Sequence, residues 1–189
     1  EGIPQNKEVR SLPYYIELLA YDLHGKFVTG SYELTVTNRN DIPEIKTQGI
    51  EVVTENEHYR YEFEVEDADF EAEGVGEALH YRVSKPSWLS IVNEEETESG
   101  KRFDLVGRPL DTEVQGVSEV VIVVTDNAGA EVSESFTIQV NNVNDVPVIT
   151  SEDRPSGEVN EWTAYPSYTL EVTDEDSIHT ETLRYELRN

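Results

Sequence analysis

The chain has 189 residues and a formal net charge of −26, because 40 aspartate and glutamate residues outnumber 14 lysine and arginine residues. A surface this acidic repels phosphate backbones and anionic headgroups, which argues against nucleic acid and direct membrane insertion. Without cysteine, the chain has neither disulfides nor thiolate metal sites. No apolar run approaches the length of a membrane span, and the start at Glu1 rather than Met predicts a fragment of a longer protein.

Alternating apolar and polar residues predict β-strands in chain order. The apolar faces are Tyr32, Leu34 and Val36; Tyr59, Tyr61, Phe63 and Val65; and Phe136, Ile138 and Val140. Residues 120–124 (VVIVV) are apolar on both faces and predict a central strand. Short strands separated by Gly, Pro, Asn and Asp are typical of an all-β sandwich.

Two features between these strands need an interpretation. Trp88 is flanked by Leu89 and Ile91, which favours a buried core tryptophan over a sugar-stacking platform. The acidic run Glu94–Glu96 predicts a solvated loop between strands.

An internal repeat organises the chain. The segment TVTNRNDIPEI (35–45) has a counterpart in QVNNVNDVPVI (139–149), and VEDAD (65–69) has one in VTDED (172–176). The spacing of Asp22 and Asp41 is 19 residues, as is that of Asp126 and Asp145. We therefore predict a repeat of about 104 residues, a normal sandwich size. The predicted segments are the C-terminal part of a first repeat (1–43), a complete repeat (44–147) and the N-terminal part of a third (148–189).

The recurring acidic and asparagine residues fall at predicted strand ends and in loops. In a sandwich that the chain enters at one end and leaves at the other, these loops gather at the junctions between repeats. Clustered carboxylates repel one another unless a cation neutralises them. Carboxylate, amide and carbonyl oxygens together are typical of Ca²⁺ sites, rather than of Zn²⁺ or Mg²⁺ sites. For single residues such as Glu57 and Asp126, solvated charge and turn capping remain alternatives.

Several motifs then point to a family. The segments TENE (54–57), PLDTE (109–113), TDNAG (125–129) and NVND (142–145) resemble the calcium-binding motifs of cadherin repeats, in cadherin order. Residues 79–91 and 103–111 are similar to dystroglycan-type cadherin-like and putative-Ig repeats, which are common in large bacterial surface proteins and adhesins. The resemblance covers the whole chain. It implies a tandem array of Greek-key β-sandwich repeats of the cadherin or Ig-like kind.

The resemblance also implies that each junction takes calcium ligands from both neighbouring repeats. At the first junction these are Glu8, Asn38, Asn40, Asp41, Asp67, Asp69 and Asp126. At the second they are Glu57, Asp111, Glu113, Asn142, Asn144, Asp145, Asp174 and Asp176. Asn6, Asn38 and Asn142 stand where the family usually has aspartate, so the first junction is expected to bind fewer ions, or to bind more weakly.

The resemblance implies a calcium-binding segment of an extracellular, secreted adhesion or extender protein, in which ions stiffen a rod of repeats. Its expected partners are calcium ions, neighbouring repeats and a cell-surface protein or polysaccharide. Two alternatives stay open: a polysaccharide-binding module, and homophilic association through the partial end repeats. The sequence shows no Ser/His/Asp grouping and no phosphate loop, and its four histidines lack metal-ligand spacing, so we expect no enzyme.

Overall fold

The computed structural model describes residues 2–151, 157–164, 167–176 and 182–188, and therefore only part of the predicted third repeat. The described elements are short strands and single turns of 3₁₀-helix. The strands are β1 (Tyr14–Tyr21), β2 (Phe27–Leu34), β3 (Glu44–Ile45), β4 (Val52–Thr54), β5 (Tyr59–Glu66), β6 (His80–Ser84), β7 (Leu89–Glu96), β8 (Gly100–Gly107), β9 (Ser118–Thr125), β10 (Glu131–Asn141), β11 (Val148–Ile149) and β12 (Val172–Thr173). The 3₁₀ turns are η1 (Asn6–Glu8), η2 (Ala68–Glu71) and η3 (Asp111–Glu113). Among the described residues, no helix is long and apolar enough to cross a membrane.

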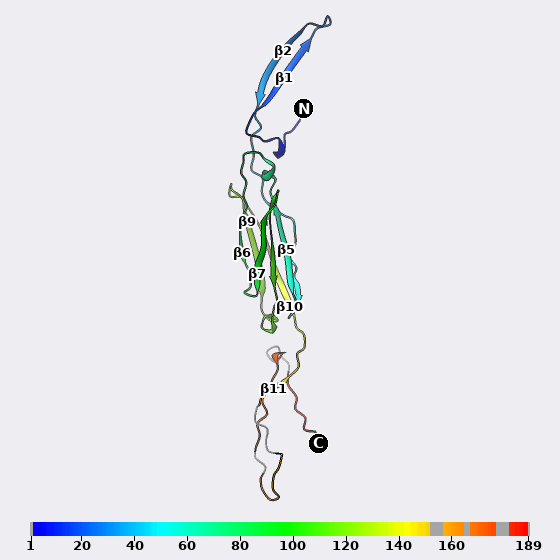
Figure 1. Cartoon of the computed structure of the whole chain (residues 1–189), viewed down its shortest axis with the longest axis vertical. Helices are drawn as coiled ribbons and strands as arrows, with labels where there is room; N and C mark the ends of the chain where they lie inside the picture. The colour runs from blue at the N-terminus through cyan, green and yellow to red at the C-terminus, as the bar shows by residue number, and fades with distance from the viewer. Residues whose placement is uncertain (1, 152–156, 165–166, 177–181, 189) are drawn as a thin grey trace.

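Strands β3 to β10 form a two-sheet sandwich at the middle of the molecule (Figure 1). One sheet has the order β4-β10-β9-β6 and the other β3-β5-β8-β7. The first strand is split between the sheets, since β3 pairs with β5 whereas β4 pairs with β10. The β4–β10 pairing is parallel, so the chain enters the sandwich at one end and leaves it at the other. The all-β sandwich prediction is confirmed.

The core of the sandwich follows the predicted alternation. Tyr59, Tyr61, Phe63 and Val65 are buried on β5, and the residues between them are partly or fully exposed. From the opposite sheet, β9 and β10 contribute Val120, Ile122, Val124, Phe136, Ile138 and Val140. Each fully buried side chain of this kind is worth about 1.5–3 kcal/mol. Strand β9 lies between β10 and β6, as expected for the central strand.

Trp88 packs against this core as predicted, but it is partly rather than fully buried. Its ring meets Tyr59 edge to face at 5.7 Å, and its indole N–H donates to the Ser118 hydroxyl at 3.2 Å. The loop predicted at Glu94–Glu96 was wrong, because these residues form the end of β7. They are exposed, but they continue the sheet beyond a register shift between Val92 and Glu95.

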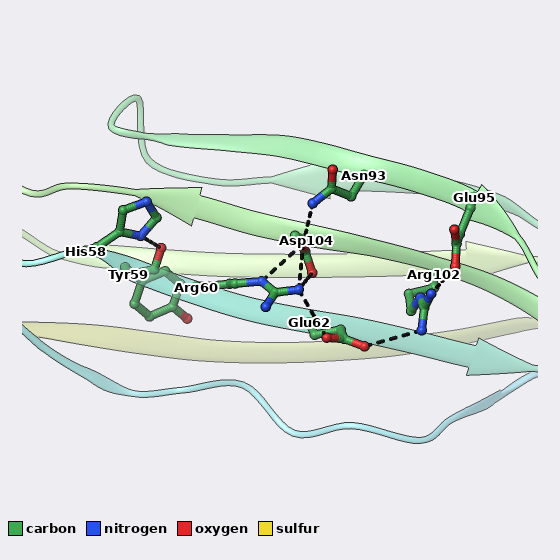
Figure 2. A network of polar contacts seen from close by, with 8 residues as sticks. All are labelled: His58, Tyr59, Arg60, Glu62, Asn93, Glu95, Arg102 and Asp104. Carbon is green, nitrogen blue, oxygen red and sulfur yellow. Dashed lines mark hydrogen bonds and ion pairs between the residues drawn. The ribbon is translucent and has the colours of Figure 1, made fainter.

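The outer face of the β5-β8-β7 sheet carries a charged network (Figure 2). The Asp104 carboxylate is buried and accepts hydrogen bonds from the Asn93 amide at 2.7 Å and from the Arg60 guanidinium at 3.0 Å. Arg60 also pairs with Glu62, and Arg102 pairs with Glu95. These bonds hold the irregular part of β7, where Asn93 has a φ of 53°, against its neighbours.

The N-terminal hairpin β1–β2 projects from one end of the sandwich (Figure 1). Its register matches that of β9–β10 at the repeat spacing, since Tyr14 pairs with Leu34 as Ser118 pairs with Ile138. The turns correspond as well, because Asp22 N–H donates to Lys26 O as Asp126 N–H donates to Ala130 O. Nearly every side chain of the hairpin is exposed within the described residues.

The C-terminal segment lies at the other end of the sandwich (Figure 1). Strand β11 pairs antiparallel with β12, with Ile149 opposite Val172. The same arrangement joins β3 to β5, with Ile45 opposite Val65. Asp174 and Asp176 directly follow β12, which places them at the start of the segment beyond the second linker.

Candidate metal centres at the two junctions

The linker between the hairpin and the sandwich is bound to two loops of the sandwich. The backbone N–H of Asp41 donates to Asp69 Oδ2 at 2.9 Å, and the side-chain amide of Asn40 donates to Asp126 Oδ2 at 2.8 Å. Asp69 follows β5, whereas Asp126 lies in the β9–β10 turn. Residues far apart in the sequence therefore meet at the first junction.

The end of β5 turns two carboxylates inward. Asp67 caps η2 by accepting the N–H of Asp69 at 2.9 Å. The two residues are only 3% and 1% exposed. Asp67 Oδ2 and Asp69 Oδ1 are nevertheless without hydrogen-bond partners in the described structure, as is the buried Oδ1 of Asn38. Burial raises the pKa of Asp67, and the charges of the neighbouring carboxylates act in the same direction. Buried oxygens of this kind carry a desolvation cost that a cation would relieve.

Asp126 is a buried carboxylate whose charge the structure supports. Burial alone would raise its pKa, but hydrogen bonds from the Asn40 amide and from the backbone of the turn outweigh burial and lower the pKa below its ordinary value. The backbone donors include the Ala130 N–H at 2.7 Å. Asp126 therefore offers an ionised oxygen ligand beside the linker.

The loop before the hairpin reaches the same junction. In η1, Glu8 Oε2 accepts the Gln5 N–H at 2.6 Å, so its carboxylate caps its own turn. The neighbouring Asn6 amide donates to Asp41 Oδ2 at 2.7 Å. The Tyr14 hydroxyl donates to Glu8 O at 2.9 Å and ties this turn to β1.

The second junction brings three carboxylates together. Ligand oxygens of Glu55, Asp145 and Asp176 all lie within 4.8 Å of one another. The linker is fastened on both sides, because Val143 N–H donates to Glu55 Oε1 and Asp145 N–H donates to Asp176 Oδ2. The Asn142 amide also donates to Asp176 Oδ1 at 2.7 Å. Glu55 Oε2 and Asp145 Oδ2 are buried and unpartnered among the described residues.

The other residues predicted for this junction lie around the cluster. Asp174 is buried and accepts the Asp176 N–H at 3.0 Å, as Asp67 does for Asp69. Asp111 and Glu113 form η3, where Asp111 is buried and Glu113 Oε2 accepts the Leu110 N–H. The Asn56 N–H donates to Pro109 O at 2.8 Å, which brings this loop beside the turn that follows β4. The Asn144 amide donates to the carbonyl of Asp145.

Glu57, the glutamate named from the sequence, is exposed and outside the cluster, whereas Glu55 is 1% exposed and inside it. The repeat spacing selects Glu57, because Glu161 lies at the same distance beyond the second linker. Strand alternation gives a different answer. Glu55 is two residues after the buried Val53, and side chains two apart share a face. The turn in which Glu57 N–H donates to Thr54 O ends that alternation before Glu57.

The donor sets of both junctions fit a hard divalent cation. Among the described residues, the groups at the junctions are carboxylates and amides, without histidine or cysteine, and oxygen-only sets of this kind suit Ca²⁺. The unpartnered oxygens come from elements on both sides of a linker or from the linker itself. An ion held by them would therefore connect consecutive segments of the chain.

No protein-family model and no curated protein matches the sequence. The extracellular cadherin domains 1–5 of protocadherin gamma B2 are similar with a TM-score of 0.51 and 17% identity, over 87% of this chain and 32% of that chain. The extracellular domain of protocadherin gamma B4 gives a TM-score of 0.48 at 17% identity, over 87% of this chain and 26% of that chain.

The SrpA adhesin of Streptococcus sanguinis gives a TM-score of 0.43 at 18% identity, over 64% of this chain and 70% of that chain. Of the two protocadherin chains named above, the present chain spans only about a third or less. Sequence identities this low are evidence for a shared fold and not for a shared activity. The split first strand, the two four-stranded sheets and the match to protocadherin gamma B2 together show that the chain has the β-sandwich fold of cadherin domains.

Proposed function

We propose that this chain is a calcium-binding segment of an extracellular adhesion or extender protein, built of tandem cadherin-like repeats. The repeats are residues 1–43, 44–147 and 148–189, with calcium at the two junctions. One observation carries the proposal. In the described part of the chain, buried carboxylate oxygens without a donor occur at both linkers, at Asp67 and Asp69 in one and at Glu55 and Asp145 in the other.

The residues have separate tasks in this proposal. Asp67 and Asp69, and correspondingly Asp174 and Asp176, present carboxylates from the repeat that follows a linker. Glu55, Asp111 and Glu113 present them from the repeat that precedes the second linker, and Glu8 has that place at the first. The linkers add Asn38, Asn40 and Asp41 at the first junction and Asn142, Asn144 and Asp145 at the second. Bound calcium supplies positive charge that offsets the repulsion between these acids. The result is a stiff connection between consecutive sandwiches.

The expected affinity is modest. Extracellular calcium modules have dissociation constants of about 10⁻⁴–10⁻³ M, and the asparagines in the linkers reduce the negative charge available. The net charge of −26 attracts cations such as Ca²⁺ to the chain. It also disfavours nucleic acid and anionic membranes as partners. We propose no catalytic role for this segment.

A calorimetric titration of the whole chain with Ca²⁺ tests the proposal. We expect a saturable heat that Mg²⁺ does not reproduce at the same concentration, and a higher unfolding temperature when calcium is present. Absence of both effects at 10-fold above the expected range, that is about 10 mM, would refute calcium binding at these junctions.

Homophilic association is a second candidate that one feature favours. The hairpin face that corresponds to the core face of β9–β10 is uncovered in the described structure, with Leu18 58% and Tyr32 52% exposed. A cavity of about 820 Å³ at its base is lined by residues that include Ile16 and Leu34. Sedimentation over a 100-fold concentration range tests this candidate, and a constant monomer mass would exclude it.

Polysaccharide binding has less support, because Trp88 packs on Tyr59. A glycan array tests it.

A further inference from the structure

Three asparagine amides donate to carboxylates at the junctions. Asn6 Nδ2 lies 2.7 Å from Asp41 Oδ2, Asn40 Nδ2 lies 2.8 Å from Asp126 Oδ2, and Asn142 Nδ2 lies 2.7 Å from Asp176 Oδ1. Each bond joins segments that are far apart in the sequence, and all three acceptors belong to the proposed calcium ligands. A bond of this kind therefore occurs at both linkers, although not between corresponding residues: Asn40 and Asn142 reach from a linker to the segment that follows it, whereas Asn6 reaches from the preceding loop to the linker.

The chemistry of this contact differs from that of two facing acids. A carboxylate that accepts an amide N–H keeps its charge at a lower cost, and hydrogen bonds to charged groups are among the stronger ones in proteins. An aspartate in place of the asparagine has no N–H to donate and adds a second negative charge. With asparagine, the linker and the adjoining loop attract each other even when no cation lies between them.

We propose that Asn6, Asn40 and Asn142 hold the junctions closed when no calcium is bound. The inference rests on the proposed function, because it concerns how the same sites behave without their ion. The linkers then do not spring apart on chelation but keep the ligands close to their bound arrangement. Calcium binding then costs less conformational entropy, which partly offsets the smaller negative charge of these sites.

The first junction has a further tie that involves no metal ligand. The Glu73 N–H, in the loop after η2, donates to Val9 O at 3.2 Å, and the Ser11 hydroxyl donates to Glu73 Oε1 at 3.3 Å. Val9 is buried. The turn that contains Asn6 is thus in direct contact with the sandwich, and the Asn6 bond adds to a contact that already exists.

Asn38 provides a matched control at the same junction. Its Oδ1 is buried without a hydrogen-bond partner in the described structure, so it offers an oxygen, and its proposed part is to bind the ion. Asn38→Ala therefore removes a proposed ligand, whereas Asn6→Ala removes an amide that donates to a carboxylate. The two variants have the same charge and the same loss of a carboxamide.

Limited proteolysis of the whole chain in EGTA measures how often each linker opens. Trypsin cleaves after Arg39, which is exposed in the first linker, and an aspartate-specific endoproteinase cleaves before Asp145 in the second. When opening is fast relative to cleavage, the rate follows the population of the open form. We expect Asn6→Ala to accelerate the first cut, and Asn142→Ala the second, by about 10-fold, which corresponds to about 1.4 kcal/mol. Asn38→Ala is expected to stay within twofold of the wild type.

Two further measurements make the outcome decisive. The thermal unfolding of the sandwich should be unchanged in all three variants, so that faster cleavage reports linker opening. Asn6→Asp should be cleaved in EGTA at least as fast as Asn6→Ala, and excess calcium should restore its protection. Equal cleavage rates in EGTA for the wild type, Asn6→Ala and Asn142→Ala would overturn the inference. Such a result would not affect the outcome of the calcium titration. Conversely, if the variants were cleaved faster but calcium gave no heat of binding, only the calcium function would be refuted.

Discussion

Replacing Glu55 by glutamine is expected to have opposite effects on the chain with and without calcium. Glu55 is 1% exposed, and only one of its carboxylate oxygens has a donor among the described residues. A buried, unsatisfied polar group costs about 1–3 kcal/mol. In Glu55→Gln, the charge is gone and the new amide N–H faces the oxygens of Asp145 and Asp176, which lie within 4.8 Å of it. The metal-free sandwich should therefore become more stable.

The size of the effect follows from these terms. For a sandwich of about 100 residues, 1 kcal/mol shifts the unfolding temperature by about 4–8 °C, so Glu55→Gln should unfold at least about 4 °C higher than the wild type in EGTA. If calcium binds with the expected dissociation constant of about 10⁻⁴–10⁻³ M, 5 mM calcium would stabilise the wild type by about 1–2 kcal/mol through mass action. The variant should lose most of this gain, because a charged ligand of the second junction is missing.

Scanning calorimetry in EGTA and in 5 mM calcium measures both effects on the same samples. Glu57→Gln is the matched control, because Glu57 is exposed and lies in the same short motif. Its stability should stay within about 0.5 kcal/mol of the wild type in both buffers. The reasoning fails if Glu57→Gln abolishes the calcium response while Glu55→Gln keeps it, or if Glu55→Gln destabilises the chain in EGTA.

Three further predictions concern the sandwich itself. Asp104→Asn should lower the free energy of unfolding by about 1–2 kcal/mol at pH 7, as the partly exposed Arg60 limits the loss. The hydrogen bond from the Asn93 amide and the charge of Arg60 outweigh burial and hold the pKa of Asp104 below its ordinary value of 3.8. The greater stability of the wild type should therefore be fully present above pH 3.8 and be lost as the pH falls further. Urea titrations at several pH values measure this difference in free energy of unfolding. Phe63→Ala should cost about 3–5 kcal/mol, because Phe63 is 0% exposed, and an equal loss in the exposed Leu18→Ala would contradict the assignment of the core. Gly100→Ala would place a Cβ atom 2.0 Å from Val65 O. The clash should lower the free energy of unfolding by about 1–3 kcal/mol, as measured by denaturant titration. An unchanged midpoint would show that β5 and β8 are not so closely paired.

The sequence was most informative where side chains alternate strictly. Residues 59–65 and 136–140 alternate without interruption, and both segments are strands whose predicted faces are buried. Strand β7 was not predicted to its end, because the three glutamates carry no apolar alternation and a register shift interrupts the pairing. Two of these glutamates, Glu94 and Glu95, form ion pairs with Lys101 and Arg102 on the adjacent strand. Cross-strand charge pairing of this kind is invisible to a pattern read along one segment.

The junctions were predictable in composition but not in contact. The repeat spacing identified the acidic motifs and named Glu57, but it did not reveal Glu55, because it compares positions along the chain and not the direction of side chains. The bond from Asn40 to Asp126 joins residues 86 positions apart, and only the folded sandwich brings them together. For the same reason Asn6 was noted from the sequence as a lost charge, whereas the structure shows it as a donor to Asp41.

The parallel pairing of β4 with β10 has a mechanical consequence. Strand β10 leads into the exit linker, and β4 is the later part of the split first strand, with its residues Val52–Thr54 beside Gln139–Asn141. Tension applied through the two linkers pulls the strands past each other along their length, so that the interstrand hydrogen bonds are loaded together in shear instead of being peeled open in turn. Resistance to such a pull depends on the rate of forced unfolding and not on equilibrium stability alone. A pull along this axis would therefore be opposed by several hydrogen bonds at once.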